Sequence, residues 1–166
     1  MIAIGIDPGS SSGAIAIMHD NSLIISDMKK TEHQISGFIF DQVLLRKQYG
    51  EDVFACIERV SAAPGQGVVS TFKFGTNYGF LRGLIVAHNV PFRDVLPKEW
   101  QKHYSMARKS STTEVKGKKK TIREPKKEWK TRLLNVAQKL YPKENIPLYA
   151  ADAVLLAHYA KQIIKS

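Results

Sequence analysis

Residues 2–18 read IAIGID (2–7), PGSSSG (8–13) and AIAIM (14–18). Two apolar runs around a segment rich in Pro, Gly and Ser predict a strand, a tight turn and a second strand. The first strand ends at Asp7, and a carboxylate at the end of a buried strand must meet a cation, hydrogen-bond donors or water. Asp7 is therefore a candidate metal or phosphate site.

The remaining sequence alternates strand and helix patterns. Strands are predicted at 23–28, 53–58 and 90–95, and helices at 31–49, 74–88, from Pro97 through Trp100, at 125–140 and at 147–165. Residues 61–70 predict a flexible loop. The strand at 53–58 is nearly all apolar, which is typical of a central strand. The order predicts one mixed α/β domain spanning residues 1–166.

Composition narrows the function classes. The chain has 166 residues, of which 43% are apolar and 24% charged, values that suit a globular domain with a real core. No apolar run approaches the roughly 20 residues that span a membrane, and no basic leader precedes the first strand. The single cysteine, Cys56, allows neither an internal disulfide nor a multi-cysteine zinc site. We expect a reducing, cytoplasmic setting.

Positive charge is concentrated in one segment. The net charge is +10, and residues 105–130 contribute +7 of it through ten Lys or Arg and three Glu. Residues 105–124 are polar and poor in apolar side chains, which predicts a basic loop that is partly disordered without a partner. Clustered charge favours nucleic acid as that partner, although a solvated loop that only aids solubility is the alternative. The candidate DNA-binding residues are Lys116, Lys118, Lys119, Lys120, Arg123, Lys126 and Lys127.

Two further acids repeat the pattern of Asp7. Glu58 ends the strand at 53–58, and Asp152 lies among alanines near the start of the last helix, where small neighbours let a helix approach a sheet closely. If the strands that end at Asp7 and Glu58 are neighbours, their carboxylates emerge side by side and repel unless a cation joins them. Oxygen ligands suit Mg²⁺ or Mn²⁺. Each acid alone could equally be a cap or a surface charge.

Four blocks of the sequence together resemble the RuvC-type Holliday-junction resolvases. They are 5–10 (GIDPGS), 57–60 (IERV), 150–153 (AADA), and 74–83 (FGTNYGFLRG) taken with 96–102 (LPKEWQK), the last of which looks most like the phage and organellar branch. The resemblance implies a ribonuclease H-like fold, with a mixed five-stranded sheet flanked by helices. It also implies a Mg²⁺-dependent homodimer that nicks two opposed strands of a four-way DNA junction; we expect the helix at 74–88 to form its interface.

The resemblance also implies roles for single residues. Asp7, Glu58 and Asp152 would be catalytic metal ligands for Mg²⁺, for which Mn²⁺ could substitute. Paired ions could activate a water and stabilise the leaving 3′ oxygen. Lys130 matches the place where the family has a lysine near the scissile phosphate, where it would offset charge in the transition state. A solvated helix lysine is the alternative at Lys130, and Lys126 and Lys127 are close rivals for the role.

The sequence departs from the family pattern near its last aspartate. The family often has a fourth acid three residues earlier, and this chain has Tyr149 there. His158 is a possible substitute, but six residues beyond Asp152 place it about 240° around the helix, facing away. Asp94 lies in a strand and has no positive argument in its favour. The missing acid leaves a junction-binding protein without nuclease activity as the first alternative function.

Aromatic residues could contact unpaired bases. Relatives can carry an aromatic residue three positions after the glutamate, but this chain has Ser61 there, so that role is not transferred. Phe72 is the best candidate for stacking on a base at a branch point, whereas Phe74 and Tyr78 suit core packing equally well.

The function predicted from these features is a structure-selective endonuclease for four-way junctions, cytoplasmic and nucleoid-associated. The resemblance leaves a phage or organellar origin open. Besides the junction binder, a nuclease without junction preference remains open. An actin-like ATPase shares the strand–Asp–turn–strand beginning, but 166 residues leave no room for its duplicated domains.

Overall fold

The computed structural model describes residues 1–9, 11–20, 22–62, 65–115 and 118–164, with the side chains of 44–46 and 113–120 not described. A five-stranded sheet organises the chain in the order β3-β2-β1-β4-β5. Its strands are β1 (Ile2–Asp7), β2 (Ala14–His19), β3 (Ser22–Asp27), β4 (Val53–Glu58) and β5 (Phe92–Val95). The first three are antiparallel, and β1, β4 and β5 are parallel. The predicted mixed sheet is confirmed, with β1 and β4 as neighbours.

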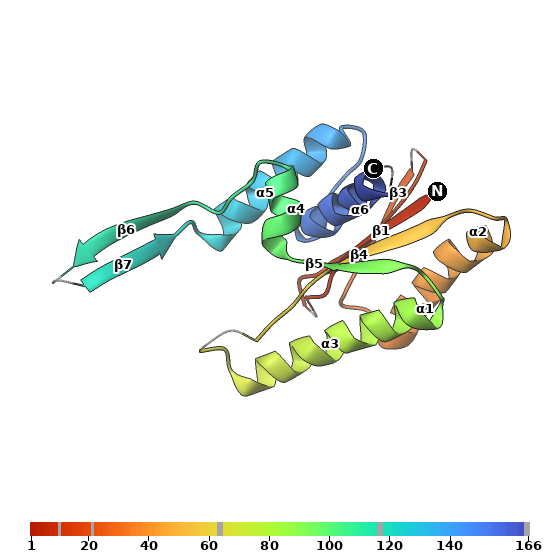
Figure 1. Cartoon of the computed structure of the whole chain (residues 1–166), viewed down its shortest axis with the longest axis horizontal. Coiled ribbons are helices and arrows are strands. Elements are labelled where there is room, and N and C mark those ends of the chain that lie inside the picture. The colour runs from red at the N-terminus through yellow and green to blue at the C-terminus, as the bar shows by residue number, and fades with distance from the viewer. Residues whose placement is uncertain (10, 21, 63–64, 116–117, 165–166) are drawn as a thin grey trace.

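Helices cover both faces of this sheet (Figure 1). One face carries α1 (Glu32–Ile39), a π-helical turn (Phe40–Leu44), α2 (Leu45–Gln48) and α3 (Val68–Ala87). The other face carries α4 (Pro97–His103), α5 (Lys126–Leu140), a 3₁₀ turn (Leu148–Ala150) and α6 (Ala151–Ile163). Within the described part of the chain, no helix has the length and apolarity needed to cross a membrane.

The two faces of the sheet differ in side-chain size. In β1, Ile2, Ile4 and Ile6 point toward α1 and α3, while Ala3 belongs to the core beneath α6. This follows from the period of two in a strand. At Gly5 an added Cβ would lie 2.1 Å from the Ala153 carbonyl oxygen and 2.2 Å from the Ala157 nitrogen. Helix α6 therefore approaches β1 as closely as a backbone without a side chain allows.

Two predicted boundaries need correction. Helix α3 begins at Val68, six residues before the predicted 74, so the expected loop at 61–70 is shorter. Its Gly75, Gly79 and Gly83 face open space, where glycine costs helix propensity but creates no clash. The loop predicted for 105–124 is also wrong in part, because 110–115 (β6) and 118–123 (β7) pair as an antiparallel hairpin. The polar Ser and Thr run at 110–113 in β6 is compatible with a strand that has no apolar face.

We call this hairpin, residues 110–123, the arm. It projects away from the sheet and its helices (Figure 1). Its base is fixed by a backbone hydrogen bond from the Glu124 N–H to the Lys109 carbonyl. The Glu124 carbonyl accepts from the guanidinium of Arg108, and its carboxylate pairs with Arg132 at 2.8 Å. Among the described residues, polar contacts at its base therefore hold the arm.

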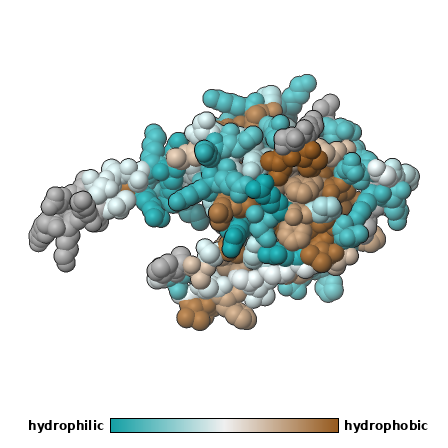
Figure 2. Space-filling model, in the orientation of Figure 1, coloured by the Kyte–Doolittle hydropathy of each residue, from teal (hydrophilic) through white to brown (hydrophobic). Residues whose placement is uncertain are grey.

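Apolar side chains also reach the surface at the start of α3. Figure 2 shows brown side chains gathered over the N-terminal end of this helix. Val68 is 85% exposed and Phe72 is 75% exposed, and Val69 is exposed beside them. Such a contiguous exposed apolar group is typical of a contact surface.

Candidate active site

Three acidic side chains converge at the carboxyl end of β1 and β4. The two strands run in register, with Ile6 opposite Ile57, so Asp7 and Glu58 are the next residues on each. By strand alternation, Asp7 lies on the same side of the sheet as Ala3 and Glu58 on the same side as Cys56, which is the side that α6 covers. Asp152 lies in the first turn of α6, and it is buried like Asp7. The predicted convergence of the three acids at one rim is therefore what the fold produces.

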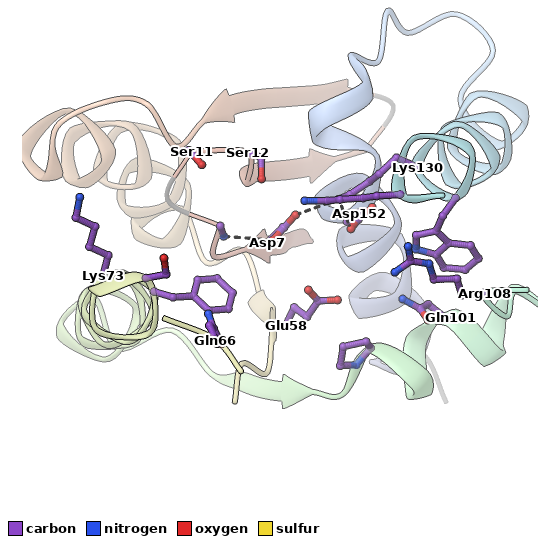
Figure 3. Close-up of a pocket in the computed structure, with 16 residues that line it drawn as sticks. Asp7, Ser11, Ser12, Glu58, Gln66, Lys73, Gln101, Arg108, Lys130 and Asp152 are labelled. Atoms are coloured by element: carbon purple, nitrogen blue, oxygen red, sulfur yellow. Dashed lines mark hydrogen bonds and ion pairs between the residues drawn. The ribbon is translucent and has the colours of Figure 1, made fainter. Parts of the chain in front are cut away.

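Lys130 reaches into this group from α5. Its Nζ lies 2.5 Å from Asp152 Oδ2, where it donates a hydrogen bond, and 3.6 Å from Asp7 Oδ2 (Figure 3). The Gly9 N–H also donates to Asp7 Oδ1, at 3.3 Å. Lys130, and neither of its rivals Lys126 and Lys127, is thus the cation that meets the acids in this structure.

The clustered charges shift one another's protonation. Burial raises the pKa of Asp7 to about 6, with Asp152 adding to the rise and Lys130 opposing it. Burial, reinforced by Asp7 and Asp152, raises the pKa of Glu58 to about 8. Burial lowers the pKa of Lys130, but the Asp152 and Asp7 carboxylates outweigh it and leave that pKa above its ordinary value. Glu58 is therefore mostly protonated at pH 7 unless a cation joins the site.

The donor set suits a hard divalent cation. Asp152 Oδ1 is buried and has no hydrogen-bond partner among the described residues, so one carboxylate oxygen of the group is an unused acceptor. Carboxylate oxygens are the ligands that Mg²⁺ and Mn²⁺ take in proteins. As the side chains stand, the described residues contain no group of three or more His, Cys, Asp or Glu arranged to hold a metal ion. Instead, Lys130 pairs with Asp7 and Asp152, and the Trp100 indole donates a hydrogen bond to Glu58.

A pocket of about 800 Å³ opens above the acids. Ser11, Ser12 and Lys73 line one side of it, and Gln101 and Arg108 line the other, with the acids between (Figure 3). Cationic and hydroxyl side chains around a carboxylate floor could bind a phosphodiester while the acids hold a cation beneath it.

Three residues at the site escaped the sequence prediction. Trp100 was expected in the core or an interface, and it is fully buried, but its Nε1 also donates to Glu58 Oε1 at 3.0 Å. Asn77 Nδ2 donates to the Pro8 carbonyl at 2.7 Å and so connects α3 to the turn after Asp7. Phe74, for which base stacking and core packing were equally open, lines the pocket. The sequence predicted a short helix from Pro97 through Trp100, but no pattern indicated that the indole would donate to an acid or to which one.

The predicted DNA-binding residues are dispersed. Lys126 lines the pocket, whereas Lys127 and Arg123 are exposed beside it on α5 and the arm. Phe72 is exposed on α3 and does not line the pocket. Lys118, Lys119 and Lys120 lie in β7, where only the backbone is described, and Lys116 lies outside the described residues.

Tyr149, at the place of the family's fourth acid, and the two possible substitutes His158 and Asp94 lie away from the acids. Tyr149 is 39% exposed and is not part of the pocket lining. His158 packs edge-on against Tyr104 and Tyr141, as its position around α6 predicted. Asp94 pairs with Arg82 at 2.9 Å and accepts a hydrogen bond from Tyr78. Neither His158 nor Asp94 therefore substitutes for the missing acid.

Comparison with known proteins identifies the fold. No protein-family model and no curated protein matches the chain. Two solved structures are similar over nearly the whole length. Thermus thermophilus RuvC in complex with a Holliday junction substrate has a TM-score of 0.58 at 14% identity, covering 99% of this chain and 96% of that one. A second Thermus thermophilus RuvC structure has a TM-score of 0.52 at 17% identity, covering 99% and 97%. The chain has a ribonuclease H-like fold. Within that class, the fold is RuvC-like.

Proposed function

We propose that this protein is a metal-dependent endonuclease that resolves four-way DNA junctions by paired nicks. The observation that carries the proposal is the meeting of Asp7, Glu58 and Asp152 with Lys130 beneath an open, cation-lined pocket. The RuvC-like fold supports it, since one similar structure is a RuvC bound to a Holliday junction substrate. The resemblance of four sequence blocks to the RuvC-type resolvases, and of one of them to the phage and organellar branch, also supports this proposal.

The residues present would divide the work. Asp7, Glu58 and Asp152 would hold Mg²⁺, or Mn²⁺ in its place, which supplies Lewis-acid activation of water and of the leaving oxygen. Lys130 would offset negative charge that builds on the phosphate, as a preformed cation in a buried site does. Trp100 would orient the Glu58 carboxyl, and the Asn77 bond to Pro8 would fix the turn that carries Asp7. The basic arm, Lys126 and Lys127 would bind phosphates, and Phe72 would stack on a base at the branch point.

We also propose a homodimer, because a four-way junction with two cutting sites matches a two-fold symmetric protein. The proposed dimer interface is the exposed face of α3 that carries Phe72, Gly79 and Gly83. Sedimentation equilibrium should give twice the monomer mass. A monomer that cuts both strands would contradict this part.

The decisive experiment is a cleavage assay on a synthetic four-way junction with Mg²⁺ or Mn²⁺, run beside Asp7→Asn. Symmetric nicks by the wild type, none by the variant, and retained junction binding by both are the expected results. Equal cutting of linear duplex would instead indicate a nuclease without junction preference.

A junction-binding protein without nuclease activity is the second candidate. It is favoured by Tyr149 at the place of the family's fourth acid and by Lys130 standing among the acids. Tight junction binding with no nicks at any divalent-ion concentration would support it. We further expect a cytoplasmic, nucleoid-associated location, which imaging of a tagged protein together with DNA would test.

A further inference from the structure

A second hollow continues from the catalytic pocket along α4. It encloses about 630 Å³ and is lined chiefly by Lys98, Gln101, Lys102, Met106 and Arg108. We call it the α4 trough. Gln101 and Arg108 line both hollows, so the trough is an extension of the pocket. In Figure 3 these two residues lie across the acids from Lys73, which places the trough at one end of the site.

The charge of the α4 trough is positive and uncompensated. Lys98, Lys102 and Arg108 line it, and no carboxylate does. Both lysines are exposed, and among the described residues neither side-chain ammonium group makes a hydrogen bond or an ion pair. Glu99, between them in sequence, is turned away to Arg93 and Tyr159. Unpaired cations beside a concave surface attract an anion from solution.

The arrangement of these cations is also ordered. Lys98 and Lys102 are one turn apart on α4, so their Cβ atoms lie roughly 5–6 Å from each other on one helix face. Arg108 is fixed because its Nε and Nη2 donate to the Glu124 carbonyl at 3.0 and 2.6 Å. The three cations thus line one hollow that adjoins the pocket, with Met106 as an apolar wall against which a sugar or base could pack.

We propose that the α4 trough binds the backbone of the DNA strand beside the scissile phosphate, with Lys98 and Lys102 each contacting a phosphate. The proposal rests on the proposed function, because it assumes that the strand passes through the catalytic pocket. The trough would thereby set the direction in which the cut strand leaves the site, a role separate from holding metal. The chemistry recognised is a row of phosphodiesters, and a single free anion would not need two lysines one turn apart.

The test compares two double variants that lose the same charge. Lys98→Ala/Lys102→Ala removes the two lysines of the trough, and Lys139→Ala/Lys143→Ala removes two exposed lysines at the far end of α5 and beyond it. Each pair is introduced into the Asp7→Asn protein so that the DNA stays intact. Junction binding is measured by fluorescence anisotropy from 50 to 300 mM KCl, and circular dichroism checks that both fold.

The trough variant should bind the junction about tenfold more weakly at 100 mM salt. Its plot of log K against log[salt] should be shallower by about 1.4–1.8, the value for two phosphate contacts. The control should change the slope by less than about 0.5. Restoring charge with Lys98→Arg/Lys102→Arg should recover most of the affinity. Equal losses in the trough and control variants would overturn the proposal, since net charge alone would then explain them.

Ethylation interference locates the contact. In the Asp7→Asn protein, ethylated phosphates next to the cleavage position should block binding, and in the trough variant that interference should vanish at the adjacent positions only. If the trough variant shows the same interference as the Asp7→Asn protein, the α4 trough does not bind the cut strand. If the Asp7→Asn protein binds no junction at all, the failure belongs to the proposed function, whereas normal binding with an unchanged trough variant defeats the inference alone.

Discussion

The acidic rim and the basic arm are built in opposite ways. The rim places its three acids where β1, β4 and α6 meet, so each acid is fixed by core packing. The arm is a two-stranded hairpin held at its base by Glu124 and two arginines. A change at the rim should therefore disturb the packing of the core, whereas a change in the arm should not. The following experiments test that difference, from the largest expected change in stability to the smallest.

Gly5→Ala should be the most damaging change. Its Cβ would lie 2.1 Å from the backbone oxygen of Ala153, so α6 must move away from β1. Overpacking against backbone should cost about 3 kcal/mol or more, which lowers Tm by roughly 6–12 °C in a chain of this size. Thermal unfolding followed by circular dichroism measures it. Gly37→Ala is the matched control, because Gly37 lies in a helix with open space around it. An unchanged Tm for Gly5→Ala would refute the close packing of α6.

Lys130→Met should destabilise the metal-free rim next. Removing one partner of a buried ion pair should cost about 3 kcal/mol here, the low end of the usual range, because the Lys130 side chain keeps some exposure. Because Lys130 stays charged from pH 5 to 8, the loss should be greatest at pH 8, where the acids ionise, and least at pH 5, where Asp7 and Glu58 are protonated. Urea unfolding at both pH values measures it. Lys139→Met, an exposed lysine on the same helix, should have little effect, and a pH-independent loss would argue against the pairing.

Glu58→Gln should stabilise the metal-free protein at high pH. The pKa of Glu58 is about 8 in the folded chain against an ordinary 4.5. The folded state favours the protonated Glu58 carboxyl. Its contribution to the free energy of unfolding is therefore fully present below pH 4.5 and is lost as the pH rises through 8. Glutamine stays neutral, so the variant should exceed the wild type by about 1 kcal/mol or more at pH 8, or 2–4 °C in Tm, and match it near pH 4.5. Equal stabilities at pH 8 would contradict the raised pKa.

Trp100→Phe should have a smaller effect on stability but a specific one on Glu58. The indole donor is lost while an aromatic ring remains, which costs about 1 kcal/mol. Since that hydrogen bond lowers the pKa of Glu58, the pKa should rise further in the variant, as carboxyl carbon NMR titration would report. Trp129→Phe is the control, because Trp129 stacks with Arg132 and has no bond to Glu58. An unmoved Glu58 titration would exclude Trp100 as a positioning residue.

Removal of the arm should alter stability least. The Glu124 N–H bonds the Lys109 carbonyl, so residues 110–123 can be replaced by two glycines without separating the ends. Tm should stay within about 2–4 °C, corresponding to less than 1 kcal/mol. Junction affinity should fall at least tenfold, and the salt dependence should become shallower. A large drop in Tm would show that the arm belongs to the folding core after all.

The sequence predicted the rim better than the arm for a physical reason. The two apolar runs placed Asp7 and Glu58 at strand ends, and alanines around Asp152 indicated a close helix. That the two strands are neighbours was only a condition in the sequence argument, and the structure meets it. The arm has no apolar alternation, so its strands gave no periodic signal and 105–124 was expected to be a loop. Trp100 shows the remaining limit, because a side-chain bond between β4 and α4 depends on a packing angle that no local pattern records.

The contrast between the two sides of β1 bears on how this shape persists through divergence. One side of β1 requires large branched side chains, and the other requires very small ones. The sheet therefore constrains the volume of each side chain more tightly than the residue type. Many isoleucine, valine and leucine exchanges preserve the first side, and many alanine, glycine and serine exchanges preserve the second. Two chains can thus share this fold although only about one residue in seven agrees, as this chain and the Thermus thermophilus structure do at 14% identity.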